Sequence, residues 1–248
     1  MKINKYKKLA NGKYKLYLDD NTNLELYEDV ILKYELLLKK CINNNQIKDI
    51  NNYNKLCEIY YFSIKSLKSR FKSIMDLKKL LISKNYSIDM IELTLTKLLQ
   101  QGYLNDDSFS RSFINNQIIT TNNGPLKIKR ELIKKGVSID LIDNNILIFD
   151  KDIQIQKINK LISRLIKTNK RCGGIVLRKK ICSYLFNLGY DGSLVNSEIT
   201  KYDFSNNVDI YKKEYNKLYN KLKSKYDGSE LEYKIKEKLY LKGLRDDS

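Results

Sequence analysis

Two stretches of this chain decide its fold: Gln101-Gly102-Tyr103-Leu104-Asn105-Asp106-Asp107-Ser108-Phe109-Ser110-Arg111-Ser112-Phe113 and Gly124-Pro125-Leu126-Lys127-Ile128-Lys129-Arg130-Glu131-Leu132-Ile133-Lys134-Lys135-Gly136-Val137. The first ends one helix and begins another, since Asn105 suits an N-cap and an acidic residue suits the first turn. The second begins a helix at Pro125, whose missing N–H would be unpaired there anyway. It ends that helix at Gly136. The two stretches predict short helices joined by tight turns.

The helix stop recurs along the chain at Asn85, Gly136, Gly189 and Gly243, with separations of 51, 53 and 54 residues. A leucine stands four positions before each stop, and a leucine or isoleucine stands eight positions before it. These two offsets lie on one helical face. Glycine and asparagine accept the left-handed conformation at a helix C-terminus, and the next apolar residue then packs back on the helix. The chain therefore predicts an internal repeat in which a helix is closed by a Schellman-type stop.

Each repeat unit is expected to hold three helices. In the first unit they are expected near 55–73, near 75–84 and at about 88–101. The second unit is expected to start at Asn105 or Asp106, the third near Asp152 and the fourth near Asn207, with the third helix of the fourth unit missing. The expected domains are residues 1–50 (a β-meander plus a helix), three repeats over 51–104, 105–150 and 151–205, and a partial repeat over 206–248.

The first 27 residues have strand-like alternation of apolar and polar positions, as in Lys13-Tyr14-Lys15-Leu16-Tyr17-Leu18. Asn11-Gly12 favours a two-residue hairpin turn, and Asp19-Asp20-Asn21 favours a second turn. We therefore expect a three-stranded meander. From Glu28 the period becomes helical. The expected helix face consists of Val30, Ile31, Tyr34, Leu37 and Leu38, and Asn43-Asn44-Asn45 is expected to serve as a linker.

The opening stretches resemble the signature of the RecX family, bacterial regulators of the RecA recombinase. Members read close to Gly-Tyr-Leu-Asp-Asp-x-x-Phe-Ala-x-x-Phe and then Gly-Pro-x-x-Ile-x-x-Glu-Leu-x-x-Lys-Gly-Ile. The resemblance covers most of the chain, is strongest over about 76–137, and extends at the N-terminus to longer Gram-positive members. The chain departs at Asn85, where glycine is usual, and at Lys39-Lys40-Cys41, where relatives tend to show a glycine. The expected fold is mainly α, with tandem three-helix, helix-turn-helix-like repeats forming an elongated curved solenoid after a small N-terminal β-meander.

Composition bounds the class of partner. The chain has 248 residues and carries 47 Lys and Arg against 29 Asp and Glu, a net charge of +18. Such an excess favours anionic partners, with nucleic acid before a membrane surface. The competing explanation is a compositional drift toward Lys, Asn, Ile and Tyr, so the distribution of charge matters more than its sum.

Residue types also exclude several chemistries. The chain has no histidine, which removes Ser-His and Cys-His catalytic pairs and histidine metal sites. No Cys-x-x-Cys pair occurs among Cys41, Cys57, Cys172 and Cys182, so free thiols are expected rather than a zinc or redox motif. No apolar run approaches the ~18–20 residues of a membrane span. We expect a cytoplasmic protein that has no cofactor, no metal, no membrane contact and no catalytic residues.

Charge is concentrated in the third expected unit. Residues 105–150 hold six basic and six acidic residues, whereas residues 151–205 hold eleven against four, with no acid between Asp152 and Asp191. A helix here carries basic residues at intervals of three and four, which makes one stripe along its length. The stripe is Lys157, Lys160, Arg164, Lys167 and Arg171. We interpret it as a surface for polynucleotide phosphate. A solvated lysine-rich face is the competing interpretation.

Weaker basic clusters occur elsewhere. The first unit carries Lys65, Lys68 and Lys72, expected to form one helical stripe, and the second carries Lys127, Arg130 and Lys134 on one face. A further cluster follows Gly173-Gly174, a pair that could expose backbone N–H groups to a phosphate and is more often a turn. This cluster is Arg178, Lys179 and Lys180. Aromatic residues such as Phe109, Phe113 and Tyr190 are expected in the core rather than stacked on bases.

Three functions are compatible with these patterns. The resemblance implies a non-enzymatic, monomeric regulator of recombination and DNA repair that binds RecA and the RecA–single-stranded DNA filament. Such a regulator inhibits filament growth, ATP hydrolysis and strand exchange. The charge also allows direct binding of single- or double-stranded DNA. The alternatives are an independent helix-turn-helix DNA-binding protein, of transcriptional or nucleoid type, and a protein-binding scaffold with incidental charge.

Overall fold

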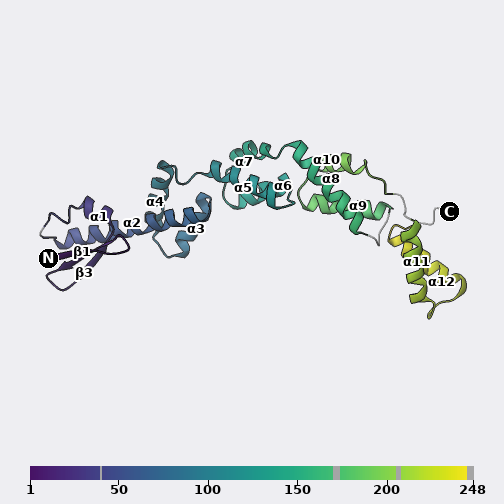
Figure 1. Ribbon diagram of the computed structural model, residues 1–248, viewed down its shortest axis with the longest axis horizontal. Helices are drawn as coiled ribbons and strands as arrows, with labels where there is room; N and C mark the ends of the chain where they lie inside the picture. Colours follow the sequence, from purple (N-terminus) through teal and green to yellow (C-terminus); the bar gives the residue numbers. More distant parts are fainter. Residues whose placement is uncertain (40, 170–173, 205–207, 245–248) are drawn as a thin grey trace. The chain divides into compact units, whose positions relative to one another are not determined.

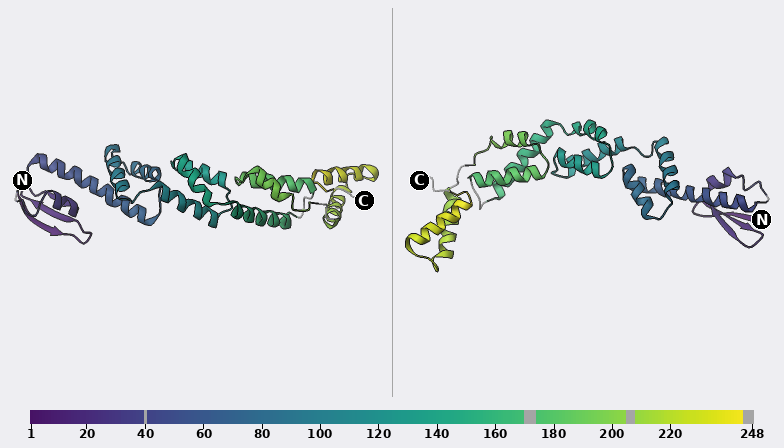
Figure 2. Two further views of the ribbon diagram at one scale, coloured as in Figure 1. Left: turned by 90° about the horizontal axis from the view of Figure 1, so that it is seen from above. Right: turned by 180° about the vertical axis from the view of Figure 1, so that it is seen from behind.

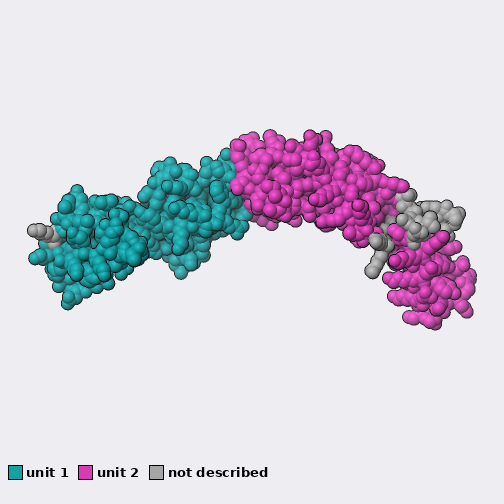
Figure 3. Space-filling view, viewed as in Figure 1, with its two compact units in different colours: residues 1–109, 135–137 teal, residues 110–134, 138–248 magenta. Residues whose placement is uncertain are grey.

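The computed structural model describes residues 1–39, 41–169, 174–204 and 208–244 (Figure 1). The fold is mainly α, with a small sheet at the N-terminus followed by successive groups of short helices, which confirms the expected fold class. The chain divides into two compact units (Figure 3). Unit 1 is Met1–Phe109 with Lys135–Val137, and unit 2 is Ser110–Lys134 with Ser138–Ser248. None of the described helices combines the length and the apolar character that crossing a membrane requires. The curvature expected of the repeat array stays a prediction.

The sheet of unit 1 is the expected meander. Strands β1 (Ile3–Lys8), β2 (Tyr14–Leu18) and β3 (Asn23–Leu26) are antiparallel and lie in the order β1-β2-β3. The first hairpin loop is longer than predicted. Leu9 N donates to Lys13 O at 2.8 Å, which leaves three residues in the loop instead of two. The prediction failed because Gly12 alone adopts a positive φ, of 80°, whereas the predicted turn needs two such residues.

The helix after the sheet is shorter than its apolar pattern suggested. Helix α1 spans Glu28–Lys33, and Glu35 enters the left-handed region with a φ of 52°. The predicted face therefore stops early, and Leu37 and Leu38 are exposed. Leu36 is buried in their place.

The asparagine run Asn43-Asn44-Asn45 was wrongly predicted to be a linker. Helix α2 spans Asn44–Ser69, about one and a half times the expected length, and Asn43 is its N-cap. The Asn43 side chain accepts from Gln46 N at 2.7 Å, and the Gln46 side chain accepts from Asn43 N at 3.0 Å. This capping box satisfies two backbone donors, so the helix starts inside an asparagine run that helix propensity alone would exclude from a helix. The helix crosses the predicted boundary at residue 50, and the domain boundaries stay predictions.

Helix α2 contributes to two separate cores of unit 1. Its first half packs Ile50 and Cys57 beneath the sheet and α1, and its second half packs Ile59 against the next two helices. Asn54 joins the helix to the sheet, since its side chain accepts from Tyr27 N at 3.0 Å and donates to Glu25 O at 3.0 Å. The two views of Figure 2 agree that the strands lie along α1 and the start of α2.

Groups of helices follow in the expected order. The first group is completed by α3 (Ile74–Ser83) and α4 (Ile88–Gln100). The second is α5 (Asp106–Thr120), α6 (Pro125–Lys134) and α7 (Ile139–Asn145), which continues as the short 3-10 helix η1 (Ile146–Ile148). The third is α8 (Lys151–Thr168), α9 (Gly174–Asn187) and α10 (Gly192–Ile199), and the last is the hairpin of α11 (Val208–Leu222) and α12 (Gly228–Leu241).

The four predicted helix stops are confirmed. Asn85, Gly136, Gly189 and Gly243 have φ of 61°, 78°, 87° and 72°. The leucine four residues before each stop and the leucine or isoleucine eight before it are fully buried, with exposed fractions of 0 or 1%. At the third stop, Tyr190 N donates to Leu185 O at 3.2 Å and Gly189 N donates to Phe186 O at 2.9 Å. This is the hydrogen-bond pair of a Schellman motif, and it satisfies carbonyls that the helix end would leave unpaired.

A helix stop also contacts the start of the second helix in the preceding group. In unit 2, Gly124 N donates to Leu188 O at 2.7 Å and Leu126 N donates to Gly189 O at 3.0 Å. A Cβ on Gly124 would lie 2.6 Å from Gly189 backbone atoms, so the two segments touch through backbone alone. Within unit 1, Ser73 makes the corresponding contact, since its Oγ donates to Lys135 O at 2.7 Å. Ser73 and Gly124 each stand twelve residues before their own helix stop. Glycine at position 124 is therefore a requirement of packing.

Candidate functional site

Helix α8 presents the most basic surface predicted from the sequence. Its N-terminus is fixed by Asp150, whose side chain accepts from Ile153 N at 2.8 Å, and by the acidic Asp152 in the first turn. One side of the helix is buried through Ile158, Leu161 and Ile162. The predicted stripe lies along the remaining surface.

Three cations form the exposed part of that stripe. Lys160, Arg164 and Lys167 are all exposed, and their spacing of four and three residues places them on one face. Among the described residues, none of the three forms an ion pair with a carboxylate. Each like-charged pair at this spacing costs the helix ~0.2–0.5 kcal/mol. This face, hereafter the α8 face, therefore combines exposure with positive charge that no side chain of the described chain neutralises.

Lys157, the first residue of the predicted stripe, has a different environment. It is half-buried, and its Nζ donates to the carbonyl oxygen of Thr121 at 2.8 Å. Thr121 follows the end of α5, so the ammonium satisfies a carbonyl at a helix C-terminus, where a positive charge is favourable. Burial, and to a lesser degree Lys160, lowers the pKa of Lys157. Lys157 therefore serves packing, whereas the next three cations are available to a ligand. Arg171, the last residue of the predicted stripe, lies outside the described residues.

A buried polar network holds α8 on α10. The Glu198 side chain is 3% exposed and accepts from Lys201 Nζ at 2.6 Å and from Asn159 Nδ2 at 2.9 Å. Tyr202 donates to Asn159 Oδ1 at 3.1 Å. The Lys201 ammonium, and then the Asn159 amide, lower the pKa of Glu198. Because Asn159 stands next to Lys160 in the helix, this network fixes the rotation of α8 about its axis and so the direction of the α8 face.

Helix α9 brings one further cation toward the end of α8. Lys180 Nζ donates to Asn169 Oδ1 at 3.1 Å, and Asn169 is the C-cap of α8. Arg178 and Lys179 are exposed on the same helix. Gly173 lies outside the described residues, so the predicted glycine-pair phosphate site stays a prediction.

The basic residues of α6 do not form a uniform face. Arg130 and Lys134 are exposed, but Arg130 Nε donates to Leu126 O at 3.2 Å within its own helix. Lys127 is half-buried, and its backbone lies against Gly189. The neighbouring Lys129 pairs with Asp143 at 2.6 Å. This surface is electrically mixed, in keeping with the balanced charge of residues 105–150.

The predicted stripe of unit 1 is interrupted at its last residue. Lys65 and Lys68 are exposed on α2, but the helix ends at Ser69 and Arg70 is extended. Lys72 therefore does not continue the helical face. Its Nζ turns back and donates to Ser66 O at 2.9 Å, which satisfies a carbonyl of the last helical turn.

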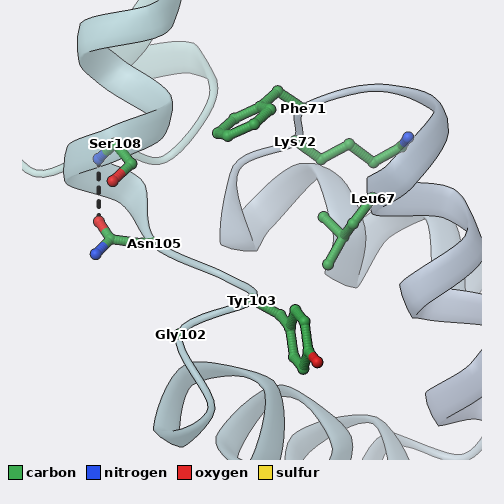
Figure 4. Close-up of a pocket in the computed structure, with 7 residues that line it drawn as sticks. All are labelled: Leu67, Phe71, Lys72, Gly102, Tyr103, Asn105 and Ser108. Atoms are coloured by element: carbon green, nitrogen blue, oxygen red, sulfur yellow. Dashed lines mark hydrogen bonds between the residues drawn. The ribbon is translucent and has the colours of Figure 1, made fainter.

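A cavity in unit 1 was not predicted from the sequence. It has a volume of about 140 Å³ and is lined from the end of α2, from the turn after α4 and from the start of α5, as drawn in Figure 4. Two aromatic residues border it, Phe71 and Tyr103, whose exposed fractions are 62% and 57%. The sequence carried a signal for the cavity, because Tyr103 belongs to the opening signature, but we expected that stretch to serve capping, turning and core packing alone.

Titratable side chains are not gathered into a metal-binding group in the part of the chain that the structure describes. Cys41, Cys57 and Cys182 are free thiols, and Cys172 lies outside the described residues. Burial raises the pKa of the Cys57 thiol to about 11, so this group is a protonated core residue at neutral pH.

The family model and the relatives described below all point to the RecX family. The family model described as the second three-helix domain of RecX matches residues 105–144. Regulatory protein RecX of Listeria monocytogenes serotype 4a is 26% identical over 209 residues, which cover 83% of this chain and 78% of the relative. Regulatory protein RecX of Lactococcus lactis subsp. cremoris is 28% identical over 261 residues, which cover 99% and 95%.

Solved structures share the fold. The crystal structure of a regulatory protein RecX has a TM-score of 0.71 at 23% identity, over 79% of this chain and 98% of that chain. RecX from Lactobacillus salivarius has a TM-score of 0.56 at 20% identity, over 59% and 95%. The family model, the relatives that span most of the chain and the shared fold agree with the signature at Gly102–Val137, and the chain is similar over most of its length to regulatory proteins of the RecX family.

Proposed function

We propose that this protein regulates homologous recombination by binding RecA and the RecA–single-stranded DNA filament. Binding limits filament growth, and with it ATP hydrolysis and strand exchange. The protein does this in the cytoplasm, without catalytic chemistry or a cofactor of its own. The observation that carries the proposal is the α8 face, in a chain that is similar to RecX regulatory proteins over most of its length.

The α8 face suits an extended anionic partner. Lys160, Arg164 and Lys167 span two turns of a helix whose rotation is fixed by the buried network at Glu198. Because the helix is held in place before the ligand arrives, only the three side chains lose freedom on binding. Each phosphate that is neutralised releases counterions, and the logarithm of the affinity for single-stranded DNA changes by about 0.7 per contact with the logarithm of salt concentration. Three contacts give a slope of about −2.

Charge reversal tests the proposal. The triple variant Lys160→Glu, Arg164→Glu, Lys167→Glu should keep the helical circular dichroism of the parent chain, because all three side chains are exposed. With RecA of the same organism on single-stranded DNA, substoichiometric parent protein should slow ATP hydrolysis and shorten filaments, and the variant should do so weakly. The matched control reverses three exposed lysines of unit 1, Lys5, Lys7 and Lys55, and so carries the same total charge.

Three outcomes would contradict the proposal. Parent protein that leaves the ATPase rate and the filament length unchanged removes RecA as the target. A selective footprint on duplex DNA in the absence of RecA would favour the independent helix-turn-helix function instead. If both triple variants lose inhibition equally, total charge rather than the α8 face is responsible.

A further inference from the structure

The exposed ring of Tyr103 is unlike its counterparts at the other helix stops. Helix α4 is followed by Gly102, which has a φ of 72°, and Tyr103 N donates to Leu98 O at 3.0 Å as in a Schellman motif. The residue after such a stop ordinarily packs against the helix. Val137, Tyr190 and Leu244 do so, with exposed fractions of 4% or less, and Tyr86 is partly buried against its core. At the end of α4 the next residue, Leu104, takes the buried position, and 57% of Tyr103 stays exposed.

A second exposed ring borders the same cavity. Phe71 follows the end of α2, and 62% of it is exposed. Figure 4 shows Phe71 on one side of the hollow and Tyr103 on the other, with Leu67 at the side of the space between them. Exposed aromatic surface of this size costs free energy that burial against a ligand would recover.

The charge around the cavity selects the class of ligand. Residues 59–75 contain no acid and hold four basic residues, Lys65, Lys68, Arg70 and Lys72, of which the last lines the cavity. The two acids at the start of α5 are not among the residues that line the cavity. Asp106 Oδ1 accepts from Ile74 N at 2.9 Å, and Asp107 has a partner of its own. An apolar ligand that carries negative charge at its edges therefore fits this place.

We propose that the cavity binds one unstacked base of single-stranded DNA on the rings of Phe71 and Tyr103, with the flanking phosphates at Lys68 and Arg70. Every base has a flat π-face, so such a site is tolerant of sequence. Bases inside a duplex are stacked on each other, so the site discriminates single strands from duplex DNA. The site lies in unit 1, apart from the α8 face, and it adds a base contact to a proposed function that otherwise rests on phosphate contacts.

Two oligonucleotides separate base contacts from phosphate contacts. One is an oligodeoxythymidylate of about 15 nucleotides, and the other has the same length and phosphates but abasic sugars. We expect the full-length protein to bind the first more tightly in fluorescence anisotropy. Phe71→Ala and Tyr103→Ala should each weaken binding of the oligodeoxythymidylate by about 5- to 100-fold and leave binding of the abasic strand unchanged. Tyr103→Phe keeps a ring and should retain affinity. Tyr6→Ala removes a ring of 54% exposure that does not line the cavity, and it should also retain affinity.

A spectroscopic variant tests the contact directly. The chain contains no tryptophan, so Tyr103→Trp introduces a single reporter that keeps an aromatic face. Its emission should be quenched by the oligodeoxythymidylate and not by the abasic strand. Equal affinity of the parent for both strands, or emission unmoved by either, would overturn the proposal. Emission that RecA alone changes, in the absence of DNA, would also overturn it and assign the cavity to a protein side chain.

RecA is absent from all of these measurements except the last one, in which RecA alone is added to the tryptophan variant. Loss of the base contact together with intact inhibition of RecA by the parent protein would remove this proposal and leave the proposed function standing. Base-dependent quenching by a protein that does not inhibit RecA would do the reverse.

Discussion

Replacement of Gly189 by alanine tests whether adjoining helical groups are joined through their backbones. Gly189 has a φ of 87°, and a Cβ at this position would lie 2.5 Å from Lys127 N and 2.8 Å from Lys127 Cβ. Neither atom belongs to the flexible end of a side chain. The alanine therefore forces the start of α6 away from the end of α9, which stretches the hydrogen bond from Leu126 N to Gly189 O.

The expected loss of stability has two parts. An L-residue in the left-handed region costs ~1–2 kcal/mol, whatever its surroundings. Insertion of a methyl group into close-packed structure adds ~1–3 kcal/mol. Gly102→Ala isolates the first part, since Gly102 has a φ of 72° and an added Cβ would meet nothing within 4 Å. We expect Gly189→Ala to lower the free energy of unfolding by ~2–5 kcal/mol and Gly102→Ala by ~1–2 kcal/mol.

Urea unfolding followed by circular dichroism measures the difference between the two variants. Repeat arrays unfold in parts, so hydrogen exchange of individual amides should accompany it. Faster exchange at Leu126 in the Gly189 variant and not in the Gly102 variant would place the effect at the contact. Equal losses in both variants would refute the close approach and leave backbone conformation as the whole cost.

Two further predictions concern the third helical group. Lys157→Met should lower the midpoint of thermal unfolding because it removes the hydrogen bond to Thr121 O, whereas Lys160→Met should leave the midpoint unchanged. Calorimetry that finds the lower midpoint in the Lys160 variant would contradict the assignment of Lys157 to packing and of Lys160 to the α8 face. Glu198 has a lowered pKa when folded, so its contribution to stability is present above the unfolded value of about 4.5 and is lost as the pH falls through the folded pKa. Glu198→Gln should flatten the dependence of stability on pH in that acidic range. If urea titrations at pH 3 to 7 give the variant the same pH dependence as the parent chain, the Glu198–Lys201 ion pair does not contribute to stability.

The repeat register was predictable because its cause is local. A helix stop needs a residue that tolerates positive φ and apolar residues at two fixed offsets, and both are visible within a dozen positions. The failures came where a local pattern has two solutions. Asparagine is a poor helix former in an interior and a good N-cap, and the reciprocal bond with Gln46 decided for the cap at Asn43. Leu37 and Leu38 fitted a helical face that ended at Glu35.

The candidate site was predictable to the level of the helix face and no further. Periodicity placed Lys157 beside Lys160, but the partner of Lys157 is a carbonyl 36 residues away in the sequence. Helical spacing carries no information on such a partner. The cavity at Tyr103 escaped prediction for a related reason. A residue that directly follows a glycine helix stop is usually buried. Whether Tyr103 or Leu104 is buried here depends on the packing of α2 against α4.

The contact between Gly124 and Gly189 has a consequence for how such a protein diverges. Because the hydrogen bonds of the joint link main-chain atoms, they can form with many different side chains around them, provided that positions 124 and 189 stay glycine. Surface residues on α6, α8 and α9 can therefore be exchanged, and the isoelectric point shifted, without loss of the joint between the groups. A fold joined in this way can be fitted to a new binding partner through changes of surface chemistry alone, with two glycines as the positions held constant.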